Sequence, residues 1–182
     1  MSFPESHDTE RLAAESGGAP EVARQRYLCA AFFSTGLMIP IGYEFGFKKR
    51  LDVVHTRLED WEAPAYDLTS YLTGVNRMKK GCPVLLEEGP MVRVNPPDEP
   101  VVLLLKSREA QPGRVLAVIN ATREEQTTRL ANLKESLGTP MRAWQDLTPD
   151  TIPLKLKAEM EFKLAPARVR IFYNPKGKPV VS

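Results

Sequence analysis

The chain has 182 residues, enough for one domain of ordinary size or two small ones. Its composition, 42% hydrophobic and 26% charged, is typical of a globular protein. The net charge is only +2, and charges of both signs are mixed along the chain, so neither nucleic acid nor an anionic membrane is an expected partner. The acidic residues near the N-terminus argue against a signal peptide, and we expect a cytoplasmic protein.

Metal and cofactor motifs are missing from the sequence. The cysteines, Cys29 and Cys82, are far apart, and the two histidines, His7 and His55, do not fall at zinc-ligand spacing with them. There is no phosphate-binding GxxxxGK[ST] loop and no dinucleotide fingerprint. We therefore expect no metal and no cofactor.

The first distinctive stretch is FPESHDTERLA, residues 3–13, which follows a possible short strand at 1–5. It places Ser6, His7 and Asp8 side by side, as a catalytic or ligand-binding loop would. A simpler interpretation stays open: Asp8 or Thr9 caps a short helix that ends at two glycines, and His7 is an ordinary surface residue.

An uncharged segment then runs from residue 27 to 43, YLCAAFFSTGLMIPIGY, at the lower limit of a membrane-spanning length. Ser34, Gly36 and Pro40 interrupt it, which argues against a membrane span. We predict a helix over residues 20–34 that opens with Pro20, and a strand over 37–43 buried on both faces, as in parallel sheets.

A long charged and aromatic loop leads to a second helix. Asp67 is its expected N-cap, and Lys79-Lys80-Gly81 its expected end. Apolar residues recur on one face at helical spacing between these points: Leu68, Tyr71, Leu72, Val75 and Met78.

Beyond residue 85 the pattern changes to short β-rich runs separated by turn residues. We predict strands at 91–94, 101–105, 115–119, 142–146, 154–157, 160–164 and 168–173. The last two alternate clearly, and Ala165-Pro166-Ala167 between them predicts a hairpin turn. The expected fold is α/β followed by all-β, with an antiparallel β-sandwich over 86–182.

The first part, residues 1–85, contains only two strand-helix units, and two parallel strands cannot enclose a core alone. Its motifs resemble those of the α-amylase family of glycoside hydrolases, in the same order. SHD resembles the motif after the seventh barrel strand, and GLMIPIGYEFG resembles the eighth strand. The helix over 67–80 resembles the closing barrel helix, and the tail ending FKLAPARVRIFY resembles the C-terminal sandwich. The loop DVVHTRLEDWE is similar to the maltosyltransferase branch.

The resemblance implies that residues 1–85 are the last two βα units of a TIM-type barrel acting on an α-glucan or maltooligosaccharide. In such retaining enzymes Asp8 would stabilise the transition state and His7 would hydrogen-bond the sugar hydroxyls. Tyr43, Glu44 and Trp61 would lie in the substrate-binding region. The nucleophile and the general acid would come from strands outside these residues, so we expect the chain to be inactive without the earlier part of the barrel or another chain.

Two other functions stay open. The chain is also compatible with a non-catalytic α-glucan-binding module, in which Trp61 stacks on a sugar ring. It is equally compatible with a structural module that docks on another chain. On the structural interpretation, Glu44 is a loop charge and Trp61 packs at a rim.

Overall fold

The computed structural model describes residues 1–130 and 133–179. The chain divides into two compact units, Met1–Arg77 and Met78–Ser182. The fold is mixed α/β, and its named strands pair in antiparallel fashion. Within the described ranges, no helix combines the length and the apolar character needed to cross a bilayer.

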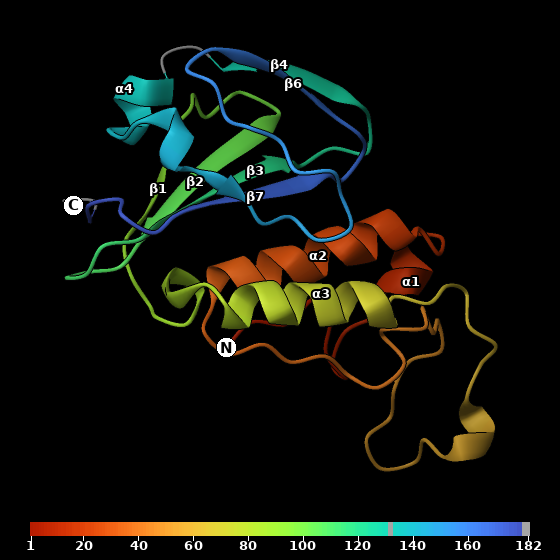
Figure 1. Ribbon diagram of the computed structural model, residues 1–182. Coiled ribbons are helices and arrows are strands. Elements are labelled where there is room, and N and C mark those ends of the chain that lie inside the picture. The colour runs from red at the N-terminus through yellow and green to blue at the C-terminus, as the bar shows by residue number, and fades with distance from the viewer. Residues whose placement is uncertain (131–132, 180–182) are drawn as a thin grey trace. The chain divides into compact units, whose positions relative to one another are not determined.

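The first unit contains α1 (Leu12–Glu15), α2 (Pro20–Phe33), the short 3-10 helix η1 (Leu58–Asp60), and α3 (Thr69–Lys80), which crosses the division (Figure 1). The sequence predicts α2 and α3 to within two residues, and α1 is shorter than the helix of the capping interpretation. The sequence analysis did not predict η1, which lies in the segment expected to be a loop. Pro20 occupies the first turn of α2, where its missing N–H costs nothing. The Oδ1 of Asp67 accepts hydrogen bonds from the backbone N–H and the hydroxyl of Thr69, the first residue of α3, so Asp67 supports the start of this helix from two residues before it.

The predicted strand over residues 37–43 is wrong in its extent. Only Leu37 pairs, in a single parallel bridge with Ser2, and the chain then turns over residues 41–46. Pro40 has no N–H to donate, and Gly42 adopts φ +86°, a left-handed conformation that extended strands do not use. Met38 and Ile41 are consequently exposed rather than buried.

The second unit contains a five-stranded antiparallel sheet in the order β1-β2-β3-β7-β5. Its strands are β1 (Met91–Arg93), β2 (Val101–Ser107), β3 (Arg114–Asn120), β7 (Val169–Asn174) and β5 (Gln145–Asp146). A separate two-stranded sheet pairs β4 (Gln126–Leu130) with β6 (Met160–Leu164), as Figure 1 shows. The described part of this unit also contains three short helical segments: η2 (Pro83–Leu85), α4 (Leu133–Leu137) and η3 (Met141–Ala143).

The predicted hairpin between residues 160–164 and 168–173 is also wrong. Strand β6 pairs with β4, whereas β7 pairs with β3 and β5, so the segment Ala165–Ala167 passes from one sheet to the other. Both strands alternate as predicted, but alternation does not specify the partner strand. The sequence analysis missed β4 and α4, and it placed a strand at 154–157, where the chain is irregular.

One apolar core joins the two sheets of the second unit. Phe162 of β6 and Phe172 of β7 meet edge to face, with ring centroids 6.0 Å apart. Trp144 is also buried in this core, where its large aromatic side chain contributes apolar area.

Candidate functional site

The His7–Asp8 pair sits on a compact turn held by its neighbours. The backbone N–H of Ser6 donates to Oγ1 of Thr9 (3.1 Å), and the Thr9 hydroxyl donates back to the Ser6 carbonyl (3.1 Å). The N–H of Asp8 donates to the Ser6 hydroxyl oxygen (3.2 Å). Thr9 therefore closes this turn and does not cap α1, so the simpler capping interpretation is wrong for both Asp8 and Thr9.

The two side chains at the tip of the turn face outward. The side chain of His7 is 48% exposed and that of Asp8 is 81% exposed, and His7 Nε2 lies 3.4 Å from Asp8 Oδ2. His7 also lines an open cavity of about 550 Å³, whose other walls are residues 50–53 of the following loop. The pair is thus accessible to a ligand, with an imidazole and a carboxylate that can both bind hydroxyl groups.

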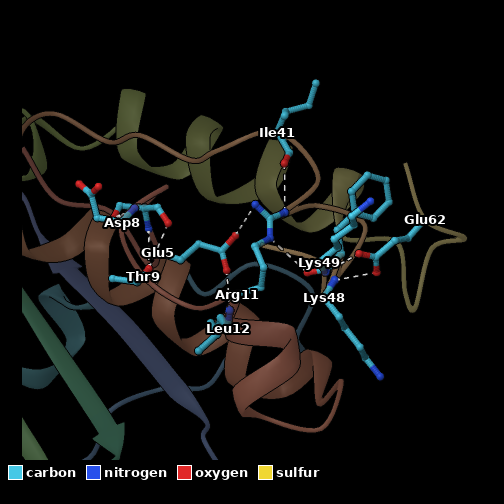
Figure 2. Close-up of polar contacts among 11 residues, drawn as sticks. Glu5, Asp8, Thr9, Arg11, Leu12, Ile41, Lys48, Lys49 and Glu62 are labelled. Atoms are coloured by element: carbon cyan, nitrogen blue, oxygen red, sulfur yellow. Dashed lines mark hydrogen bonds and ion pairs between the residues drawn. The ribbon is translucent and has the colours of Figure 1, made fainter. Parts of the chain in front are cut away.

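Buried charges hold this turn from below. Glu5 and Arg11 flank the turn in sequence, and both are almost fully buried. Their side chains form an ion pair with Arg11 Nη1 3.2 Å from Glu5 Oε1, and Glu5 Oε2 accepts the N–H of Leu12 at 2.6 Å (Figure 2). The Glu5 carboxylate therefore binds the first turn of α1, which has no other side-chain cap.

Arg11 also reaches the turn that follows α2. Its Nη2 donates to the carbonyl of Ile41 (3.0 Å), and its Nε donates to the carbonyl of Phe47 (3.2 Å). One guanidinium thereby connects the segment beside His7 and Asp8 to both ends of residues 41–47, as Figure 2 shows. The planar fork of arginine suits such a set of contacts better than a lysine ammonium does.

Burial is the largest influence on the pKa of the Glu5 carboxyl. Desolvation raises the pKa of the Glu5 carboxyl above its ordinary value, and the Leu12 N–H and the Arg11 charge act in the opposite direction. Burial likewise raises the pKa of the nearby Tyr66 hydroxyl to about 12, with the Glu5 charge adding to the effect. Tyr66 therefore stays protonated and neutral at physiological pH.

Tyr43 and Glu44, which the sequence analysis assigned to substrate binding, lie on the 41–47 turn. Tyr43 is buried, and its hydroxyl donates to the Ala23 carbonyl of α2 at 2.5 Å, so its side chain packs inside the unit rather than in the open cavity. Glu44 is half-buried, its carbonyl accepts the N–H of Leu68 at 2.8 Å, and its buried Oε2 has no hydrogen-bond partner among the described residues.

The loop over residues 48–62 is held together by acidic side chains. Glu62 accepts the backbone N–H groups of Lys48 and Lys49 (Figure 2), and Asp60 binds the Lys49 ammonium. Asp52 accepts the N–H groups of His55 and Val54, and these bonds lower the pKa of its carboxyl. The loop is therefore locally ordered by its own hydrogen bonds.

Trp61 lies at the end of this loop with 47% of its surface exposed. Its ring meets Phe47 edge to face, with centroids 5.9 Å apart and an interplanar angle of 63°. It lines a small cavity of about 20 Å³ that is separate from the cavity at His7, although Arg50 and Leu51 line both. The structure thus brings His7 and Asp8 together, whereas Trp61 lines a different cavity from His7.

The sequence analysis missed Glu5 and Arg11. Each is a single charge in a segment whose sequence is typical of a polar loop. Glu5 and Arg11 pair with each other across the turn, and the Ile41 carbonyl that Arg11 binds lies 30 positions away in the sequence. The one local signal is a pair of opposite charges that flanks SHD and precedes the apolar Leu12 and Ala13. Within the described ranges, no three His, Cys, Asp or Glu side chains are grouped closely enough to hold a metal ion.

Comparison with known proteins gives a fold. No protein-family model matches the sequence, and no curated protein matches it. Among solved structures, AmyP in complex with maltose covers 99% of this chain, with a TM-score of 0.71 and 14% identity. The chain has the fold of part of an α-amylase.

Two other α-amylase-type structures agree with this fold. The α-amylase from Geobacillus thermoleovorans, complexed with acarbose, covers 94% of this chain with a TM-score of 0.67 and 19% identity. The debranching enzyme from Nostoc punctiforme, soaked with acarbose, covers 93% with a TM-score of 0.59 and 17% identity. This chain spans only 41%, 38% and 32% of the three matched chains, respectively.

Proposed function

We propose that this chain supplies His7 and Asp8 to an α-amylase-type active site that acts on α-1,4-glucans, and that it is inactive alone. The observation that carries the proposal is the position of these two residues. They stand exposed at the tip of a turn, at the end of a segment that pairs in parallel with Leu37, in a chain that has an α-amylase fold over nearly its whole length.

The chemistry of the pair suits a distorted sugar ring. The transition state of a retaining glycosidase is oxocarbenium-like, so the negative charge of Asp8 favours it. The His7 imidazole can hydrogen-bond the hydroxyls of the same sugar, and its contact with Asp8 keeps both groups at one point of the surface. Asp8 would be a transition-state stabiliser, and His7 a substrate-binding residue.

The proposed inactivity follows from the number of carboxyl groups needed. Retaining hydrolysis uses a nucleophile and a general acid about 5 Å apart. Asp52 is the carboxylate among the residues that line the His7 cavity, and its Oδ1 already accepts two backbone N–H groups, so it is a poor candidate for either role. On this proposal residues 1–85 correspond to the last two βα units of a barrel, and residues 86–182 to a C-terminal β-sandwich. The earlier part of the barrel, or another chain, would supply the missing groups.

The test is a binding and turnover experiment on the 182-residue chain. Acarbose should bind weakly and perturb the NMR resonances of His7 and Asp8, and maltotriose should not be cleaved. The variant Asp8→Ala should lose the perturbation, while Asp98→Ala, on an exposed turn of the second unit, should retain it. Perturbations confined to residues outside 5–12 and 48–53 would contradict the proposal, as would glucan cleavage by the chain alone.

Trp61 favours a second candidate, a non-catalytic α-glucan-binding module. Its indole is half exposed and braced by Phe47, and such an aromatic face suits a pyranose ring. Under this alternative, Trp61→Ala would weaken maltooligosaccharide binding more than Asp8→Ala does. Calorimetric titration of the two variants separates the two functions.

A further inference from the structure

We infer that Arg11 is a positioning residue for the site, acting through the backbone of two separate segments. The inference rests on the proposed function for its consequence in binding, but its structural part does not require that a glucan binds. We call the group formed by Glu5, Arg11 and the carbonyls of Ile41 and Phe47 the Arg11 clasp.

The clasp closes the loop that carries the exposed pair. Residues 5 and 11 stand at the two ends of the excursion that exposes His7 and Asp8, and their side chains meet beneath it. Inside the excursion, the hydrogen bonds among Ser6, Asp8 and Thr9 join residues of the tip to one another. The clasp joins the two ends of the excursion to each other and to residues 41 and 47.

The same guanidinium fixes a second segment. By accepting hydrogen bonds from Arg11, the Ile41 and Phe47 carbonyls hold the turn that contains Glu44 and leads into the 48–62 loop. Close packing supports this arrangement, since a Cβ built on Gly42 would lie 2.9 Å from Arg11 Nη2 and 2.2 Å from the Phe47 ring. The wall of the His7 cavity formed by residues 50–53 follows this turn directly in sequence.

The clasp is internal and does not touch a ligand itself. Arg11 is 1% exposed, so the surface of the site is presented by His7, Asp8 and residues 50–53. Arg11 would thus affect binding by fixing the positions of His7, Asp8 and residues 50–53 relative to one another, since a misplacement of about 1 Å can greatly weaken the action of a site.

The test uses the 182-residue chain and the variant Arg11→Met, with Arg11→Lys and the exposed-residue control Arg26→Met on α2. Amide and imidazole resonances are recorded under conditions in which each variant is folded, as judged by unchanged resonances of β3. In Arg11→Met we expect resonances of both residues 6–9 and residues 42–47 to shift, with about a tenfold loss of acarbose affinity. Arg11→Lys, which retains the charge beside Glu5 but lacks the fork, should shift residues 42–47 and recover only part of the affinity. Arg26→Met should change neither.

Two results would overturn the inference. One is a lower melting temperature in Arg11→Met with unchanged His7 and Asp8 resonances and unchanged affinity, which would mark Arg11 as a purely structural residue. The other is a shift of residues 6–9 without any shift of residues 42–47. If the unsubstituted chain does not bind acarbose at all, the proposed function fails, whereas the resonance comparison still decides whether the clasp positions both segments.

Discussion

A single buried arginine determines how the exposed residues of this chain are held. Arg11 binds one carboxylate and two carbonyls, and every one of these groups belongs to a segment that lacks regular secondary structure. In such segments side chains must satisfy the backbone groups that a helix or sheet would otherwise pair. Tertiary contacts of this kind are the reason that the sequence alone predicted His7 and Asp8 as exposed candidates but not the residues beneath them.

The first prediction concerns the pH dependence of the clasp. Removing Arg11 takes away a charge that lowers the pKa of Glu5, so the folded-state pKa of Glu5, already raised by burial, rises further. A raised carboxyl pKa gives a stability contribution that is complete below the unfolded value of 4.5 and is lost as the pH rises through the folded value. Arg11→Met should therefore destabilise the chain by about 3 kcal/mol at neutral pH, the order found for breaking buried pairs, and by less near the unfolded pKa of Glu5. Urea unfolding at both pH values measures this difference.

The control for this prediction is the double variant Glu5→Gln with Arg11→Met. This double variant removes both charges, so its loss of unfolding free energy relative to the original chain should depend little on pH. An equal cost of Arg11→Met at both pH values would contradict the assignment of the Arg11 charge as an influence that lowers the pKa of Glu5.

A second prediction at this scale concerns Asn120 in the second unit. Its amide nitrogen donates to the carbonyls of Glu124, Leu164 and Ala165, and its oxygen accepts from Thr122. Asn120→Asp would replace the amide N–H groups, which donate to three carbonyl oxygens, by a buried carboxylate oxygen that can only accept. We expect a loss of about 3 kcal/mol of folding stability. Asn120→Asp with unchanged denaturation midpoint would contradict this role.

At the scale of the elements, helix signals were reliable and strand partners were not. Pro20, Asp67 and the glycines after α1 mark helix ends through local chemistry, and the structure confirms these ends within a few residues. The hairpin predicted at Ala165-Pro166-Ala167 failed because β6 and β7 find their partners in different sheets, through contacts with residues far away in sequence. The strand predicted over 37–43 failed at Pro40 and Gly42, whose backbone restrictions a count of apolar residues does not include.

Gly42 yields a prediction about the turn after α2. With φ +86°, an alanine there is strained by about 1–3 kcal/mol from backbone conformation alone, and its Cβ would also overlap Phe47 and approach Arg11. Gly42→Ala should therefore cost about 3 kcal/mol or more of stability.

Gly17→Ala is the matched control for that substitution. Gly17 also has a positive φ, +69°, but a Cβ there would meet nothing within 4 Å. It should cost only about 1 kcal/mol, the backbone penalty without overlap. Equal melting temperatures for the two variants would show that the packing around Gly42 is looser than the structure indicates.

At the scale of the whole molecule, the chain divides into two compact units, and the apolar core around Phe162 and Phe172 is built from residues of the second unit. Changes in the clasp should therefore act on the first unit by itself. In Arg11→Met, hydrogen exchange should accelerate for amides of α2, while amides in the centre of β3, such as those of Leu116 and Val118, should keep their protection. Equal acceleration in both would mean that the chain opens as one cooperative unit.

Structural similarity gives this chain the fold of part of an α-amylase, and the role that we propose for it in an α-glucan site depends on His7 and Asp8. The most direct test of that role is an NMR titration of the chain with acarbose, following the imidazole of His7 and the amide of Asp8. The account predicts saturable shifts at both residues that disappear in Asp8→Ala. Saturable shifts elsewhere on the chain with none at His7 and Asp8, or an unperturbed spectrum at saturating acarbose, would contradict it.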